Sequence, residues 1–362
     1  MEASPFPYQG PLDPDQVRAR EPLIADLIER VTEHRVTALL GPRRYGKTSV
    51  MRRVAADVGA AGVLVVWVDL YEVSSMADLA TRLDTALAVA GATDDRVTRF
   101  ASAMQLRLGV VHVELRRPPA QRPDPLTTVH VQLDVLTEVA RARPVLAVVD
   151  EFSGIARVGG AAGLLRTHLQ PHYQQLGLLF AGSAPSMMRT LFSVQEQPFY
   201  SQADLIELEP FTTEEVVAIV SDGFATTSRQ AGDLGARIAE FAGGHPQRTM
   251  QAADAAWRLT EPGGTAAATT WADALADVRA GTASGLERLY SSLQPRERDV
   301  LRIVAGGGSP FGSAAELFEL GPGAAQHARQ SLIDSGHLRR SNGRISPVDP
   351  VFADWIRHRF PI

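Results

Sequence analysis

Only one lysine occurs in this chain, and it lies in a glycine-rich segment. Lys47 belongs to Gly41-Pro-Arg-Arg-Tyr-Gly-Lys-Thr48, which fits the phosphate-loop pattern G-x-x-x-x-G-K-[ST], whereas every other member of the 36 Lys and Arg residues is arginine. An ammonium reaches the β- and γ-phosphates from a helix N-terminus as a compact charge, and a planar guanidinium has a different geometry. The segment therefore predicts a nucleoside triphosphate site.

The loop supplies several kinds of contact to such a ligand. Its glycines let backbone N–H groups point inward, and the helix that begins at Lys47 adds positive potential. The hydroxyl of Thr48 is the expected Mg²⁺ ligand. Arg43 and Arg44 either contact phosphates or nearby acidic residues, or are solvated. The candidate nucleotide-binding residues of the loop are Gly41, Pro42, Arg43, Arg44, Tyr45, Gly46, Lys47, Thr48 and Ser49.

An acidic pair follows a continuous apolar run and complements the loop. Val145–Val149 has the length of a buried strand, and Asp150 and Glu151 follow it directly. An aspartate at the end of a strand beside a phosphate loop holds Mg²⁺, and an adjacent glutamate can polarise a water for in-line attack. These residues indicate hydrolysis as well as binding. Lys47, Glu151 and Ser183 are the candidate catalytic residues, and Thr48 and Asp150 are the candidate metal ligands.

Ser183 is a candidate because of its place after the next apolar run. Leu178–Ala181 precedes Gly182 and Ser183, so the hydroxyl is expected at a strand end. There it either orients the attacking water or contacts the γ-phosphate, or it acts only as a cap.

Strands that alternate with helices must position these side chains. Apolar runs at 36–40, 63–68, 145–149, 178–181 and 205–208 predict strands, and helical periodicity fits 21–34, 75–89 and 129–141. Alternation at Val111, Val113 and Leu115 predicts one more, half-buried strand. This order predicts an α/β fold with a parallel sheet whose site lies at the carboxyl ends of the strands.

The second half of the chain is predicted to be helical. Thr212 and Glu215 form a capping-box pattern, and helices are expected at 231–242 and after Pro246. From Leu293 onward, three helices precede two short strands, the order of a winged helix-turn-helix. The domain prediction is an N-terminal arm at 1–16, a P-loop ATPase core at 17–209, a helical lid at 210–265, a linker helix at 266–289 and a winged helix-turn-helix at 290–362.

Composition narrows the function classes. A net charge of −5 argues against coating nucleic acid through bulk charge, and the absence of cysteine excludes disulfides, thiolate metal sites and a cysteine nucleophile. No apolar run approaches the roughly 18–20 residues of a membrane span, and the first residues lack the features of a signal peptide, so a cytoplasmic location without membrane contact is expected. His168 and His172 have the spacing of a metal pair, but Pro171 between them disfavours zinc.

The candidate wing carries Arg339, Arg340 and Arg344 near a predicted hairpin. These side chains would suit DNA phosphates. The alternative is that the segment docks on its own ATPase core or on another protein.

The quoted motifs resemble the archaeal-type ATPases of the STAND/AAA+ group of P-loop proteins, over about Val17 to Phe360. The matching segments are Arg18-Ala-Arg-Glu21, the phosphate loop, Val68-Asp69-Leu-Tyr71, Val149-Asp-Glu-Phe152, Ala181-Gly-Ser183 and Gly244-His-Pro246. The resemblance implies ATP with Mg²⁺ as cofactors and places His245 and Pro246 near the adenine. Relatives often carry an arginine where this chain has Gln202, so hydrolysis is either slow or served by an arginine elsewhere, such as Arg189 or Arg248.

Three functions stay open at this point. The first is an ATP-binding and ATP-hydrolysing switch that couples nucleotide state to a protein contact, a DNA contact or self-association. The second is an ATP-dependent DNA-binding protein of initiator or regulator type. The third is a scaffold with a structural nucleotide.

Overall fold

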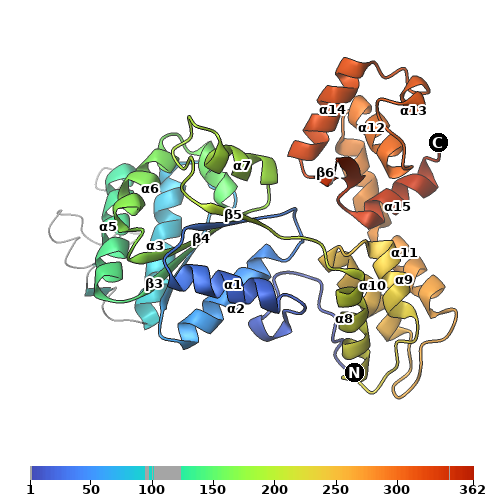
Figure 1. Cartoon of the computed structure of the whole chain (residues 1–362), viewed down its shortest axis with the longest axis horizontal. Helices are drawn as coiled ribbons and strands as arrows, with labels where there is room; N and C mark the ends of the chain where they lie inside the picture. The colour runs from blue at the N-terminus through green and yellow to red at the C-terminus, as the bar shows by residue number, and fades with distance from the viewer. Residues whose placement is uncertain (1, 94–97, 100, 102–123, 342) are drawn as a thin grey trace, which may run out of the picture. The chain divides into compact units, whose positions relative to one another are not determined.

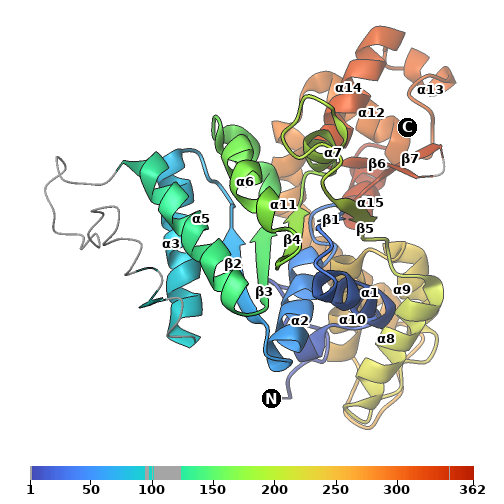
Figure 2. The same cartoon turned by 60° about the vertical axis from the view of Figure 1, so that its left-hand side comes forward.

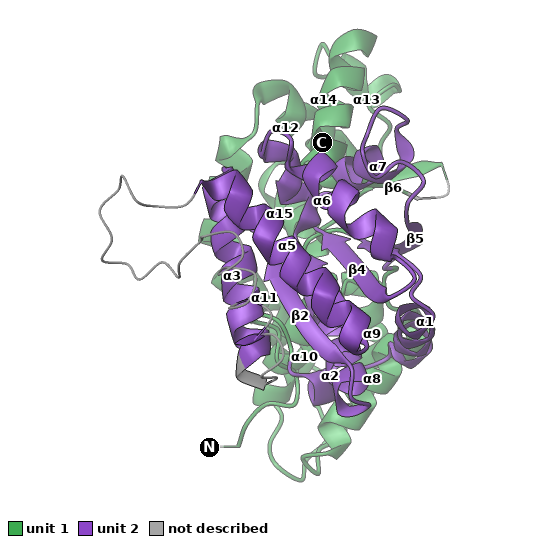
Figure 3. Cartoon of the chain, turned by 90° about the vertical axis from the view of Figure 1, so that its left-hand side faces the viewer, with its two compact units in different colours: residues 1–12, 42–46, 209–362 green, residues 13–41, 47–208 purple. Residues whose placement is uncertain are grey.

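The computed structural model describes residues 2–93, 98–99, 101, 124–341 and 343–362 (Figure 1). They form two compact units, which Figure 3 distinguishes by colour. The sheet unit comprises 13–41 and 47–208, and the helical unit comprises 1–12, 42–46 and 209–362. The strand predicted around Val111, Val113 and Leu115 lies outside the described residues.

A parallel five-stranded sheet forms the centre of the sheet unit. Its strands are β1 (Thr37–Leu40), β2 (Leu64–Asp69), β3 (Val145–Asp150), β4 (Leu176–Gly182) and β5 (Asp204–Glu207), in the order β2-β3-β4-β1-β5. All the pairings are parallel. Residues of β1, β3 and β4 are buried throughout, as strands covered on both faces require. The predicted α/β fold with a parallel sheet is confirmed.

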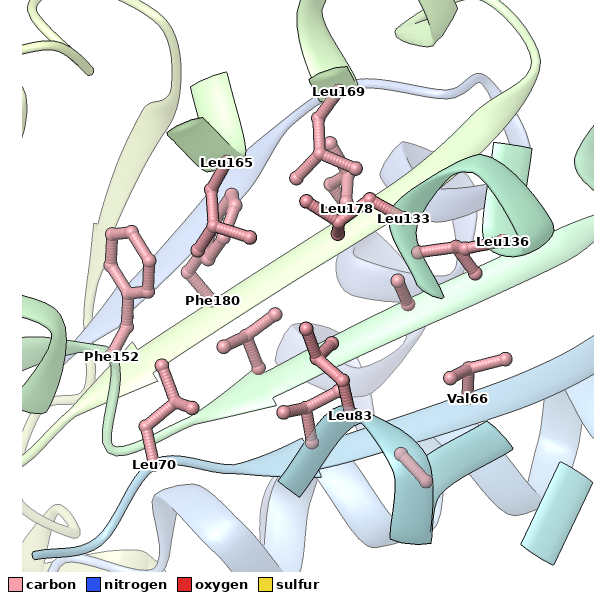
Figure 4. Packing of buried hydrophobic residues seen from close by; sticks show 14 of the residues in the cluster. Val66, Leu70, Leu83, Leu133, Leu136, Phe152, Leu165, Leu169, Leu178 and Phe180 are labelled. Atoms are coloured by element: carbon pink, nitrogen blue, oxygen red, sulfur yellow. The ribbon is translucent and has the colours of Figure 1, made fainter. Parts of the chain in front are cut away.

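Helices cover both faces of this sheet (Figure 2). On one side lie α1 (Glu21–Thr32) and α2 (Lys47–Ala60), and on the other lie α3 (Met76–Thr93), α5 (Pro125–Ala142) and α6 (Ala161–Leu169). The remaining elements are α7 (Pro185–Ser193) and short 3-10 turns at Pro14–Gln16, Phe152–Arg157 and Gln170–His172. Figure 4 shows Leu83, Leu133 and Leu165 of the second group packed on strand residues such as Phe180.

In the helical unit, the part from residue 209 onward starts with three helices. These are α8 (Thr213–Ala225), α9 (Leu234–Ala242) and α10 (Pro246–Arg258). The predicted capping box of α8 is confirmed, because Thr212 Oγ1 accepts from Glu215 N at 3.1 Å and Glu215 Oε2 accepts from Thr212 N at 2.7 Å. The long helix α11 (Thr270–Ser292) follows.

The N-terminal residues pack on these helices. Phe6 is buried with its ring 5.8 Å from that of Phe224, and the amide of Gln247 donates to the carbonyl of Tyr8. Arg229 forms an ion pair with Glu2 at 2.6 Å. The segment therefore contributes apolar core to the helical unit, which its proline-rich composition did not indicate.

The C-terminal bundle, as we call α12–α15 with β6 and β7, has its own apolar core. Its elements are α12 (Pro295–Ala305), α13 (Ser313–Glu316), α14 (Pro322–Asp334), β6 (Leu338–Ser341), β7 (Arg344–Pro347) and α15 (Pro350–Arg359). The predicted pair of short strands is confirmed as an antiparallel ladder. The helix predicted near 314–320 is shorter, because Glu319 adopts a left-handed conformation with φ 48°.

Among the described residues, no helix combines the length and the apolar character that crossing a membrane requires.

Candidate functional site

The phosphate loop joins β1 to α2, as its sequence predicts. Gly46 has φ 89°, a left-handed conformation that favours glycine, and a Cβ on Gly41 would lie 3.2 Å from Leu208 Cβ. Lys47 is 6% exposed, and its Nζ donates to the carbonyl of Gly41 at 2.7 Å. The ammonium therefore lies inside the turn of the loop, at the N-terminus of α2. Ser49 is buried in the first turn of the same helix.

Thr48 and Asp150 meet although they are far apart in sequence. Thr48 Oγ1 donates to Asp150 Oδ2 at 2.8 Å, and the other oxygen of Asp150 accepts from the backbone N–H of Glu151 at 2.9 Å. Burial raises the pKa of Asp150. The two hydrogen bonds oppose this shift, and the nearby charges of Glu151 and Asp69 add to it. A bound cation would stabilise the charged form of the Asp150 carboxylate, because it would offset both the burial and the repulsion by the acidic neighbours.

The donor set at this point fits Mg²⁺. Magnesium takes few protein oxygens and keeps several waters or phosphate oxygens, so a hydroxyl and one carboxylate suffice. Among the described residues, no group of three or more His, Asp or Glu side chains is arranged to hold a metal by itself. Thr48 and Asp150 would therefore hold the ion together with the ligand's phosphates.

Glu151 and Ser183 are also brought together at the carboxyl ends of β3 and β4. Glu151 Oε2 accepts from Ser183 Oγ at 2.7 Å and from Ser183 N at 3.1 Å. The backbone of Glu151 is left-handed, with φ 50° and ψ 40°, a conformation that costs on the order of 1 kcal/mol for a non-glycine residue. Ser183 thus contacts the candidate base itself, a pairing that strand ends alone do not reveal.

The middle of the phosphate loop, Pro42–Gly46, belongs to the helical unit. Tyr45 is 2% exposed, its ring lies 4.9 Å from that of His245, and its hydroxyl accepts from Arg339 Nη1 at 3.3 Å. Arg43 and Arg44 are exposed. Of the three arginines of the candidate wing, Arg339 contacts the phosphate loop through Tyr45, whereas Arg340 and Arg344 are exposed.

His245 and Pro246 begin α10. His245 Nδ1 accepts from the backbone N–H of Arg248 at 3.4 Å, which places the neutral ring's proton on Nε2. Burial lowers the pKa of His245 to about 4; the charge of Asp349 opposes this shift and that of Arg248 adds to it. The imidazole is therefore neutral at physiological pH.

Arg248 forms an ion pair that sequence reasoning missed. Its Nε and Nη2 donate to the two carboxylate oxygens of Asp349 at 2.9 and 2.5 Å, and its Nη1 donates to Gln251 at 2.6 Å. The only local signal at Asp349 is the proline after it, which marks a helix start.

The other candidates lie in separate places. Arg189 forms an ion pair with Glu207, and Gln202 donates to a nearby backbone carbonyl. His168 does not pair with His172; its Nε2 lies 2.6 Å from His130 Nδ1, and its Nδ1 lies 3.3 Å from a carboxylate oxygen of Asp134.

Comparison with known proteins supports the fold. No family model matches the chain, and no curated protein matches it. A Walker-type ATPase of Pyrococcus abyssi has a similar structure, with a TM-score of 0.72 at 17% identity over 98% of this chain and 99% of that one. The ADP form of the ORC2 protein of Aeropyrum pernix is similar with a TM-score of 0.53 at 15% identity, over 98% and 97% of the two chains. At such identities the likeness shows the fold, which is that of a P-loop ATPase.

Proposed function

We propose that this chain binds ATP with Mg²⁺ and hydrolyses it, as a switch that couples nucleotide state to contacts of its helical unit. The observation that carries the proposal is the hydrogen bond between Thr48 and Asp150 beside the buried Lys47. It joins the phosphate loop to the acidic strand end, the arrangement that holds a metal-bound phosphate. The fold shared with a protein described as a Walker-type ATPase supports the same conclusion.

Each residue has a defined task in this proposal. Lys47 exchanges its bond to Gly41 for phosphate oxygens, and Thr48 and Asp150 hold the ion, which supplies charge neutralisation when bound. Glu151 accepts a proton from the attacking water. Ser183 is a positioning residue, because it holds the carboxylate of Glu151 rather than a reacting atom.

Two substitutions test binding and hydrolysis separately. Lys47→Ala should abolish binding of a fluorescent ATP analogue, whereas Arg52→Ala, which removes an exposed cation from the same helix, should leave the affinity unchanged. Glu151→Gln should preserve binding and slow turnover. Unchanged affinity in Lys47→Ala would refute the nucleotide site, and native turnover in Glu151→Gln would show that another group is the base.

The helical unit supplies the moving parts. We propose that α8–α10 form a lid, with His245 and Pro246 near the adenine, and that α12–α14 with β6 and β7 form a winged helix-turn-helix. The order of these elements and the antiparallel pairing of the two strands support the second assignment. Nucleotide-dependent self-association would distinguish a switch of this kind from a scaffold that retains its nucleotide without turnover.

DNA binding is the second candidate function, favoured by exposed Arg340 and Arg344 on β6 and β7. Neutralising both arginines should abolish a salt-dependent mobility shift of duplex DNA. If no shift occurs at low salt, with or without ATP, the C-terminal bundle has a protein contact instead.

A further inference from the structure

Three parts of the helical unit meet at one side chain of the phosphate loop. Tyr45 is buried, its ring contacts His245 at the start of α10, and its hydroxyl accepts a hydrogen bond from Arg339 of β6. The loop residue is thus held from two sides, once by the proposed lid and once by the C-terminal bundle. A loop that binds phosphates by backbone N–H groups depends on its conformation, so these contacts bear on the site.

A second interaction joins the same two parts close by. Arg248 is in the first turn of α10, and its guanidinium makes two parallel hydrogen bonds to Asp349, which precedes α15. The arginine side chain is 6% exposed and the aspartate side chain 22% exposed. Bidentate pairs of this kind are strong and fix orientation as well as distance.

Asp349 is held firmly in this geometry. Its Oδ1 accepts from the backbone N–H groups of Val351 and Phe352 at 3.0 and 3.3 Å, so the same carboxylate caps α15. Burial by itself would raise the pKa of Asp349, but the hydrogen bonds and charge of Arg248 outweigh it and lower the pKa below its ordinary value. The carboxylate stays charged and the pair stays formed at neutral pH.

We propose that Tyr45 is a positioning residue through which the lid and the C-terminal bundle hold the phosphate loop, and that the Arg248–Asp349 pair is the latch that keeps these two parts together. The inference rests on the proposed nucleotide function and states how the C-terminal bundle regulates it. With the latch closed, Tyr45 is held from both sides and bound nucleotide is released slowly. With the latch open, Arg339 leaves Tyr45, the loop loosens and nucleotide is released faster.

The chain offers a matched pair of substitutions for the test. Asp349→Asn removes the charge of the latch, while an asparagine still caps a helix well. Asp354→Asn is the control, because it breaks another bidentate ion pair of the same unit, in which half-exposed Arg279 donates to buried Asp354 at 2.8 and 3.0 Å. That second pair joins α11 to α15 and includes no loop residue.

Two readouts are measured on the full-length chain. The first is the dissociation rate of a fluorescent ATP analogue chased with unlabelled ATP. The second is the distance distribution between spin labels at Glu240→Cys in α9 and Glu316→Cys in α13; both sites are exposed, and the sequence has no cysteine of its own. The second readout needs no nucleotide.

Asp349→Asn should raise the dissociation rate about tenfold, within the usual range of coupling between sites, and should broaden the distance distribution. Arg248→Gln should have the same effect, and the double variant should add nothing, because both residues form one interaction. Tyr45→Phe, which lacks the hydroxyl bonded to Arg339, should raise the rate without changing the distances. Asp354→Asn should leave the rate unchanged.

The latch proposal is refuted if Asp349→Asn and Arg248→Gln leave both the dissociation rate and the label distances unchanged. This conclusion requires that the wild type binds the analogue and that Lys47→Ala does not. If the wild type does not bind ATP, the proposed function fails, and the label distances alone decide whether the latch exists. Should Asp349→Asn not fold, Arg248→Lys keeps the charge but loses the parallel bonds, so it tests the same contact.

Discussion

Lowering the pH from 7 to 5 should destabilise the helical unit through His245. The pKa of this imidazole is lowered from 6.5 to about 4 by burial, so the unfolded chain binds a proton over a range in which the folded chain does not. Stability is therefore lost as the pH falls through this window. Linkage gives a loss of about 2 kcal/mol between pH 7 and pH 5, and about 3 kcal/mol once the pH is below both pKa values.

The assay is denaturant unfolding at several pH values, followed by tryptophan fluorescence, to which Trp257, Trp271 and Trp355 of the helical unit contribute beside Trp67 of the sheet unit. His245→Asn is the matched variant, because asparagine can accept the capping hydrogen bond of α10 but does not titrate. Burial also lowers the pKa of His337 in the same unit, which gives wild type and variant an equal additional slope. The wild type should lose about 2 kcal/mol more than the variant over this range. Equal losses in the two proteins would refute the burial of a neutral imidazole at this position.

The remaining predictions concern one site contact and two packing positions. Ser183→Ala removes a hydrogen bond to the Glu151 carboxylate, so kcat for ATP should fall about tenfold with little change in KM; an unchanged kcat would contradict its positioning role. Gly244→Ala should cost about 3 kcal/mol of unfolding free energy, because the residue has φ 72° and its Cβ would lie 2.0 Å from a backbone oxygen. Gly243→Ala shares the left-handed conformation without the collision and should cost about 1 kcal/mol, so equal costs would remove the steric argument. Phe6→Ala should destabilise the unit by about 3 kcal/mol in thermal or denaturant unfolding; a neutral effect would mean that the N-terminal segment contributes nothing to its core.

The parts of this fold that the sequence predicted are those encoded by local patterns. An apolar run, a glycine loop and a helical period in succession indicated β1, the phosphate loop and α2, and the run before Asp150 indicated β3. Thr212 and Glu215 predicted the start of α8 because a capping box involves only four residues. These signals also predicted the parallel sheet, since alternating strands and helices leave few other arrangements.

The parts that it did not predict depend on contacts between distant residues. Arg248 and Asp349 are 101 positions apart, and nothing local to either indicates the other. His168 has the helical spacing to pair with His172, yet it lies against His130 on another helix. Tyr45 lies in a loop whose sequence motif predicts phosphate binding. That motif does not indicate that the tyrosine ring packs against His245. Side-chain partners of this kind follow from tertiary packing rather than from periodicity.

The burial of Lys47 has a consequence for covalent chemistry. Among the 362 residues its side chain is the one lysine amine, it is 6% exposed, and it is bonded to the carbonyl of Gly41. Reagents and enzymes that acylate lysine, or attach a modifier to it, require an accessible amine. On this chain they have a single lysine target, and they reach it only when the phosphate loop opens. Lysine modification would therefore report on the state of that loop and on no other part of the surface.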